Sequence, residues 1–279
     1  MSTTATTTNG LVEVRVEQGY RVWSLGAAPV NALSPELLSD LETALDEAVA
    51  DETTAVVVLT SSLKVFSAGA DATWMAGLVE REGMDVLVET FVRTMNRFRG
   101  LNLRLRQSPV LVVAALNGHT LAGGLELAAA CDLRFCADEE RLRLGVPEMD
   151  LFGVMPTGGG GAPFLARLMP PSRALDFILE AKPVSPQRAY DSALVDRLYP
   201  AAELLPATER FAAEVAAKAG RIGVAAVKRS VLGGAELPLY EALELDQSLH
   251  WDSVRRGNFR RGVQGFVDQF ASRSAGAGS

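Results

Sequence analysis

The sequence predicts an α/β fold in which helices alternate with the strands of a parallel sheet. Two continuous aliphatic runs, at 55–60 and 110–116, are typical of strands buried on both faces. Segments of helical periodicity separate such runs, and the chain beyond Pro200 is almost wholly helical. This alternation is the pattern of repeated βαβ units. We therefore expect an α/β core at residues 11–200 and a helical C-terminal region at residues 201–273.

The elements follow from local signals along the chain. Two short strands are expected within 11–25, and Ser34 and Pro35 mark a helix start, since Ser caps helices and Pro fits the first helical position. Apolar residues at helical spacing continue that helix to Ala50 and outline another at 88–105. Residues 1–10, rich in Thr, are expected to form a flexible arm. Further strands are expected at 132–137 and 193–198, and helices at 211–218, 223–232, 239–251 and 259–270.

Composition excludes several classes of protein. With 279 residues, 48% of them hydrophobic, the chain can bury a sizeable core without disulfides or metals. A net charge of −7 argues against general nucleic-acid binding, and no apolar run is long enough to span a membrane. Cys131 and Cys136 match no zinc pattern and are expected to be buried, reduced thiols. Nothing indicates export, so we expect a cytoplasmic protein.

Glycine-rich segments raise the question of nucleotide binding. The segment 118–125 has the glycine spacing of a phosphate-binding loop, but Gly124 and Leu125 replace the Lys and Ser/Thr that hold phosphate and magnesium. The run of four glycines at 158–161 lacks the preceding strand and following acidic residue of a dinucleotide fold. No Gly-x-Ser-x-Gly motif is present, so a hydrolase of the usual α/β type lacks its nucleophile.

Three other segments place polar groups among small or apolar residues. Gly123 follows a predicted strand and opens a helix, where free N–H groups and the helix dipole suit a developing negative charge. Glu126 lies one turn later in apolar surroundings, either with a chemical task or as a simple helix cap. The loop 65–71 exposes backbone N–H groups, and Asp71 either contacts a ligand or caps the next helix. Glu148 is again set among apolar neighbours.

Taken in order, these segments resemble the crotonase (enoyl-CoA hydratase/isomerase) superfamily. The resemblance rests on Pro29-Val-Asn-Ala-Leu33, Phe66-Ser-Ala-Gly-Ala-Asp71, Ala115-Leu-Asn-Gly-His-Thr-Leu-Ala-Gly-Gly-Leu-Glu-Leu-Ala-Ala-Ala-Cys-Asp132 and Leu144-Gly-Val-Pro-Glu148. It covers about residues 11–270. Such a resemblance implies a spiral of ββα units with a helical C-terminal region that packs in trimers, often stacked as hexamers.

The resemblance also implies a substrate and a site. Family members bind an acyl-CoA thioester and hold its carbonyl oxygen between two backbone N–H groups, which by motif match belong to Ala68 and Gly123. Gly69, Ala70 and Asp71 are then expected to line the substrate site with them. Coenzyme A is part of the substrate, so no separate cofactor and no metal are expected.

Hydratases of this family carry two glutamates, and Glu126 and Glu148 stand at the matching positions. The resemblance implies that Glu126 handles the attacking water and Glu148 supplies a proton. Two carboxyl groups in one dry site do not easily both ionise, so an acid can coexist with a base. Trp74, Met75, Leu78 and Met84 either border the acyl pocket or are ordinary core.

Departures from the family pattern leave other reactions open. After the second glutamate the sequence reads Pro156-Thr-Gly-Gly-Gly-Gly-Ala-Pro-Phe164, without the usual Gln-Arg pair. An enoyl-CoA isomerase would need only one base, at the Glu148 position. A decarboxylase, a thioester hydrolase and a biosynthetic tailoring enzyme remain alternatives on the same scaffold. A non-catalytic protein that binds acyl-CoA or RNA is the hypothesis from another class.

Overall fold

A seven-stranded sheet forms the centre of the computed structural model, which describes residues 5–154, 158–257 and 259–276. The first three strands pair antiparallel and the others continue the sheet in parallel. Parallel strands need helical crossovers, which cover both faces of the sheet. In spatial order the strands are β1 (Ala5–Asn9), β2 (Val12–Glu17), β3 (Tyr20–Leu25), β5 (Val56–Ser61), β8 (Leu111–Leu116), β10 (Leu133–Ala137) and β12 (Arg197–Tyr199).

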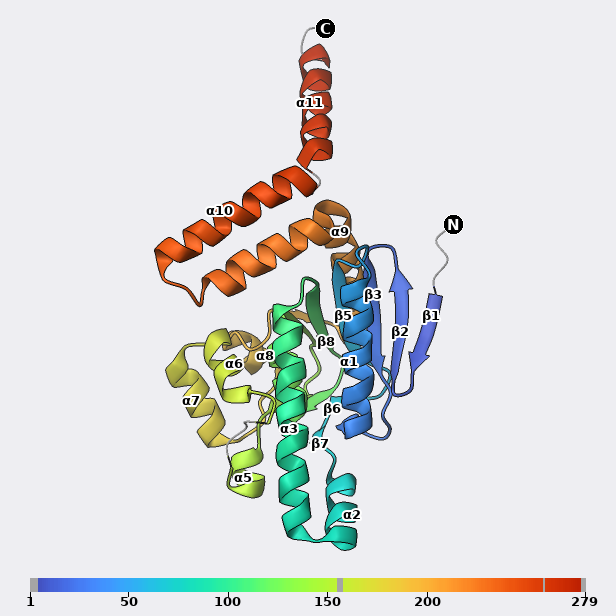
Figure 1. Ribbon diagram of the computed structural model, residues 1–279, viewed down its shortest axis with the longest axis vertical. Helices are drawn as coiled ribbons and strands as arrows, with labels where there is room; N and C mark the ends of the chain where they lie inside the picture. The colour runs from blue at the N-terminus through green and yellow to red at the C-terminus, as the bar shows by residue number, and fades with distance from the viewer. Residues whose placement is uncertain (1–4, 155–157, 258, 277–279) are drawn as a thin grey trace.

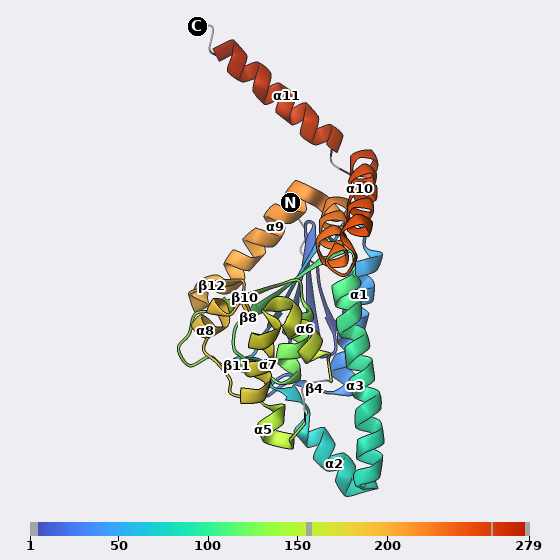
Figure 2. The same cartoon turned by 90° about the vertical axis from the view of Figure 1, so that its left-hand side faces the viewer.

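Helices cover the two faces of this sheet. Helices α1 (Pro35–Ala50) and α3 (Met84–Gln107) pack side by side on one face, and α9 (Ala201–Lys228) crosses the other (Figure 2). All six residues of β5 are buried between these layers, as its unbroken apolar run predicts. The core therefore lies on both sides of the parallel strands.

Two small parallel sheets lie beside the main one and carry the candidate site loops. Strands β6 (Val65–Ser67), β9 (His119–Leu121) and β11 (Leu144–Gly145) form one, and β4 (Ala32–Leu33) and β7 (Gly69–Ala70) form the other. The short helix α4 (Gly123–Ala130) follows β9 and is buried along its whole length. The remaining helices of the body are α2 (Ala72–Glu82), α5 (Glu148–Phe152), α6 (Gly161–Leu168), α7 (Pro171–Glu180) and α8 (Pro186–Asp191).

The C-terminal helices extend away from the body (Figure 1). A π-helical turn, η1 (Arg229–Gly233), follows α9 and leads to α10 (Leu239–Arg256) and α11 (Phe259–Gly276). Helix α11 projects farthest and carries exposed apolar side chains, among them Phe259 and Val263. The start of α9 coincides with the expected boundary at residues 200 and 201, although the division into two regions stays a prediction.

The structure confirms the predicted α/β class and corrects three details. The strand expected at 193–198 begins only at Arg197, because Leu194 and Val195 donate back to the Ala189 carbonyl and close a turn. The helices expected at 211–218 and 223–232 are largely one helix, α9, interrupted at Gly220 (φ 62°) and followed by η1. The arm expected to be flexible at 1–10 contains strand β1. No helix within the described ranges is long and apolar enough to cross a membrane.

Candidate active site

Helix α4 presents backbone N–H groups at its first turn. The chain enters the helix at Ala122, whose φ of 51° turns it sharply and which supplies no side-chain cap. The first N–H groups of a helix have no intrahelical acceptor, so the N–H of Gly123 suits an anionic ligand atom. Because Gly123 is buried, such a ligand would be shielded from water, where an N–H donor acts most strongly.

The loop before α2 lies directly against this helix start. A Cβ atom on Gly69 would stand 2.6 Å from Ala122 Cβ and 2.9 Å from the Gly123 nitrogen, so only glycine permits the approach. Asn31, from the Asn-Ala-Leu segment, fixes the loop by donating to the carbonyls of Val65 (3.1 Å) and Phe66 (3.0 Å). The two glycine-containing segments predicted from sequence therefore meet.

Several groups of this loop are engaged within the protein. The Ala68 N–H donates to the Val30 carbonyl at 3.0 Å, so it must leave that acceptor to bind an oxyanion, and its role as a donor stays a prediction. The Asp71 carboxylate accepts from the Trp74 N–H at 2.9 Å and caps α2, which is the structural role considered for it. Gly69 and Ala70 form β7, which pairs with β4, and the Gly69 N–H contacts Ser67 Oγ at 3.2 Å.

Glu126 is held by the glycine run that follows α5 in sequence. The carboxyl group is almost fully buried, with 3% of the residue exposed. Its Oε2 accepts from the Gly159 N–H at 2.9 Å, and its Oε1 accepts from the Gly161 N–H at 2.7 Å. Gly161 is the first residue of α6, so the positive end of that helix also faces the carboxylate. Glu126 is therefore not a simple cap of its own helix.

Burial and hydrogen bonding act on Glu126 in opposite directions. Burial raises the pKa of Glu126 above its ordinary value, and the two N–H donors from Gly159 and Gly161 offset part of that rise. Because both donors bind the charged form, they favour an ionised carboxylate in an otherwise apolar setting. A buried carboxylate of this kind is suited to accept a proton.

Glu148 begins α5, shortly after β11, and its environment differs. Burial, together with the charge of Glu126, raises the pKa of Glu148 to about 7, so the two carboxyl groups lie within electrostatic reach. Glu148 Oε2 is buried without a hydrogen-bond partner among the described residues. A buried polar atom without a partner is costly, and a bound water or ligand would satisfy it. Glu148 is thus suited to hold and release a proton near neutral pH.

Sequence reasoning missed part of this arrangement. It ruled out the run 158–161 for nucleotide binding and gave it no role, yet two of its N–H groups hold Glu126. The signal that could have revealed this role is the run of four consecutive glycines shortly after Glu148. Cys131 and Cys136 are buried, and burial raises the pKa of each thiol to about 12, which removes them as nucleophiles.

The four residues considered for the acyl pocket differ in their exposure to solvent. Leu78 is buried, Trp74 and Met75 are half-buried, and Met84 is exposed, so these side chains do not share one environment.

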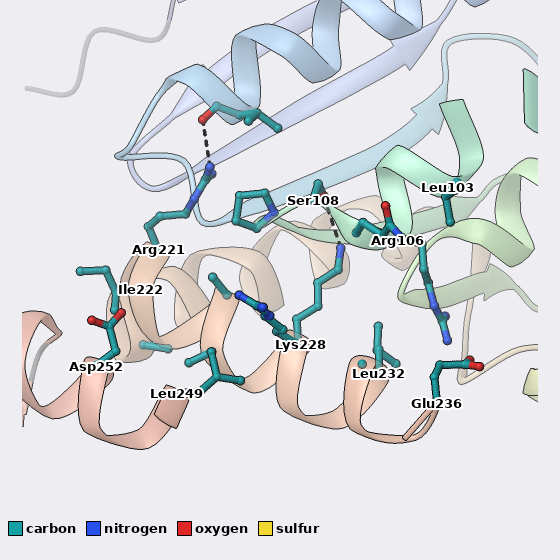
Figure 3. A pocket seen from close by; sticks show the side chains of 18 of the residues that line it. Leu103, Arg106, Ser108, Arg221, Ile222, Lys228, Leu232, Glu236, Leu249 and Asp252 are labelled. Carbon is teal, nitrogen blue, oxygen red and sulfur yellow. Dashed lines mark hydrogen bonds between the residues drawn. The ribbon is translucent and has the colours of Figure 1, made fainter. Parts of the chain in front are cut away.

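A cavity between α3, α9 and α10 is lined by Arg106, Lys228 and other residues, but neither Glu126 nor Glu148 lines it (Figure 3). No group of three metal-ligating side chains occurs in the described part of the chain.

Comparisons with known proteins identify relatives of this chain. The family model described as enoyl-CoA hydratase/isomerase matches residues 25–273. A Bacillus subtilis protein named as an enoyl-CoA hydratase/isomerase is 34% identical over 240 residues, covering 86% of this chain and 87% of its own. The probable enoyl-CoA hydratase echA8 of Mycobacterium tuberculosis is 31% identical, covering 87% and 88%.

Solved structures show the same fold. An enoyl-CoA hydratase from Geobacillus kaustophilus superimposes with a TM-score of 0.86 at 30% identity, covering 96% of this chain and 97% of its own. One from Bacillus anthracis gives a TM-score of 0.85 at 28% identity, covering 93% and 97%. The expected fold, an α/β spiral with a helical C-terminal region, is thereby confirmed.

Proposed function

Because the chain belongs to the enoyl-CoA hydratase/isomerase (crotonase) family, we propose that it adds water to a 2-enoyl-CoA thioester and forms a 3-hydroxyacyl-CoA. The observation that carries the proposal is a pair of carboxyl groups with unlike environments, in which Glu126 is buried and Glu148 is half-buried. Glu126 accepts two backbone N–H bonds, whereas Glu148 has a pKa raised to about 7. Such a pair supplies a base and an acid in one dry site.

The proposed reaction uses the two glutamates and the start of α4. The thioester carbonyl oxygen accepts from the Gly123 N–H and from the Ala68 N–H, which must leave the Val30 carbonyl to do so, and the two donors stabilise the enolate-like charge. Glu126 removes a proton from water as its oxygen bonds to the β-carbon. Glu148 gives its proton to the α-carbon, and the two electrons of the double bond form that C–H bond. Glu126 ends protonated and Glu148 ionised, and a proton exchange with solvent restores both.

Isomerisation of a 3-enoyl-CoA is the second candidate, and one observation favours it. A carboxyl group with a pKa near 7 and a buried oxygen without a described partner could alone move a proton between two carbons of the acyl chain. Hydration is preferred because Glu126 is also buried and positioned beside the same site, and an isomerase has no need of it.

The proposal includes a coenzyme A thioester as substrate, no separate cofactor, and assembly as a homotrimer or homohexamer. Apolar side chains on the projecting helices, Leu239, Tyr240, Phe259 and Val263, support the assembly, because a single chain leaves them exposed. Sedimentation of the full chain is expected to give a multiple of 29.7 kDa. A monomer at micromolar concentration would contradict the assembly.

Loss of the enoyl-thioester absorbance tests the activity directly. Crotonyl-CoA mixed with the protein is expected to lose this absorbance as 3-hydroxybutyryl-CoA forms, which chromatography identifies. A 3-enoyl-CoA offered separately distinguishes isomerisation, because that reaction creates the absorbance. A panel of chain lengths and aryl substrates then defines the acyl group. Binding of CoA thioesters without any turnover would favour a non-catalytic binding protein.

A further inference from the structure

A buried amide on α3 contacts the glycine run that holds Glu126. Asn102 is 0% exposed, and its Nδ2 donates to the Gly159 carbonyl at 2.9 Å. A Cβ atom on Gly159 would stand 2.4 Å from Phe98 Cε1 and 2.6 Å from Asn102 Nδ2. Helix α3 therefore packs directly against the backbone of the run. Only glycine at position 159 allows this contact, because any side chain would collide with the helix.

The position of this bond within the run matters. Glu126 accepts from the N–H groups of Gly159 and Gly161, which belong to the first and third of three successive peptide units. The Gly159 carbonyl that Asn102 binds belongs to the peptide unit between them. Consecutive glycines have wide conformational freedom, so such a run needs outside contacts to keep two N–H groups directed at one carboxylate.

We propose that Asn102 is a positioning residue, whose bond to the central peptide keeps both donor N–H groups on Glu126 and so keeps that carboxylate ionised and oriented. The catalytic consequence of this inference rests on the proposed function. The anchor itself, the hydrogen bond from Asn102 to the Gly159 carbonyl, does not. The amide orientation follows from its partner, because only the NH₂ group can bind a carbonyl. Oδ1 is buried with no partner in the described part of the chain, so Asn102 carries a cost that packing alone does not explain.

Replacement of the amide by a side chain of similar size tests the anchor. In Asn102→Leu, backbone amides in the segment 158–165 are expected to exchange with deuterium about tenfold faster, because one buried hydrogen bond is lost. Asn102→Ala, which leaves space instead of crowding Phe98, is the second variant should Asn102→Leu fold poorly. Thr94→Val is the matched control, since Thr94 is also buried on α3 but donates to the Thr90 carbonyl of its own helix.

The catalytic consequence has a signature that a packing defect would not give. Weaker N–H bonds to Glu126 raise its pKa, so the acid limb of kcat/KM for the enoyl-CoA is expected to move up by about one pH unit. Glu148 is the titratable group that interacts electrostatically with Glu126, and it is present in every variant. We expect kcat to fall about 10-fold to 100-fold with little change in KM.

The outcomes separate the two proposals. Faster exchange together with a shifted acid limb in the Asn102 variants, and neither in Thr94→Val, supports the positioning role. Wild-type exchange or an unshifted acid limb in a folded Asn102 variant overturns it. Absence of enoyl-CoA turnover in the wild-type protein instead overturns the proposed function, and the exchange rates of the segment 158–165 then decide the anchor alone.

Discussion

Glu126 and Glu148 are chemically identical side chains that the fold treats differently. Two backbone N–H groups bind Glu126, so its charge is compensated although the group is buried. Glu148 has one buried oxygen without a described partner, and burial together with the Glu126 charge raises its pKa to about 7. In the proposed reaction, the difference between base and acid thus arises from the surroundings of the two carboxyl groups and not from residue type.

The pKa of Glu148 predicts the pH dependence of the reaction. A raised pKa means that the carboxyl group keeps its proton up to about pH 7, and only that form can protonate the α-carbon. We expect kcat/KM to fall as pH rises through about 7, by about tenfold per pH unit above it. Residual turnover of Glu148→Gln should lack this limb. A wild-type profile that stays flat up to about pH 9 would contradict the assignment.

At the scale of elements, the site forms where short strands and helix starts meet. Asn31 donates to two carbonyls of β6, and Gly69 brings the chain after β6 against the first turn of α4. The start of α6 approaches the same helix and binds Glu126. Backbone groups of the β6–β7 segment, the start of α4 and the start of α6 therefore lie around the Glu126 carboxylate and the Gly123 N–H. Their positions relative to one another depend on close contacts between the segments.

Substitution of Gly69 tests this close contact. Gly69→Ala places a methyl group 2.6 Å from Ala122 Cβ and 2.9 Å from the Gly123 nitrogen, so the donor N–H must move. We expect kcat/KM for the enoyl-CoA to fall by about 10²-fold or more. Gly83→Ala is the control, because Gly83 has nearly the same φ (90° against 92°) but nothing within 4 Å of its added methyl group. Equal activity of the two variants would show that the contact is not needed.

The sequence predicted these elements unevenly, for physical reasons. Buried strands such as β5 and β8 were predicted because their apolar runs are continuous, and α1 because Ser34 and Pro35 mark its start. Glu126, Gly123 and Glu148 were predicted as site residues from local motifs, and their roles stay predictions. The occupied Ala68 N–H and the donors Gly159 and Gly161 were not, because hydrogen bonds between segments more than 30 residues apart leave no local pattern.

At the scale of the whole molecule, one buried ion pair joins the C-terminal helices to the sheet. Lys228, at the end of α9, lies 2.7 Å from Asp132 Oδ2, and both side chains are 4% exposed. The Lys228 ammonium also donates to the carbonyls of Leu105 (2.9 Å) and Val110 (2.8 Å), and to Ser108 Oγ (Figure 3). The end of α3, the start of β8 and the end of α9 are thereby fixed to one another.

Removal of one partner is expected to destabilise the protein strongly. Lys228→Met leaves the Asp132 carboxylate buried without its counter-charge, which costs about 3–5 kcal/mol of unfolding free energy. Urea unfolding at fixed protein concentration measures this loss. Arg167→Met is the control, because the Arg167–Glu236 pair is 44% and 50% exposed and solvent screens its attraction, so its loss should change the unfolding free energy little. A similar loss in both variants would contradict the anchoring role of Lys228.

The division of labour between the two glutamates is the central claim, and crotonyl-CoA hydration by Glu126→Gln and Glu148→Gln tests it most directly. Each variant removes one proton-transfer group, so each should lose about 10²- to 10⁴-fold in turnover. Affinity for the CoA thioester should survive, because the oxyanion donors are backbone groups. With a 3-enoyl-CoA as substrate, loss of turnover in Glu148→Gln but not in Glu126→Gln would indicate an isomerase. Hydration at the wild-type rate by both variants would contradict the account.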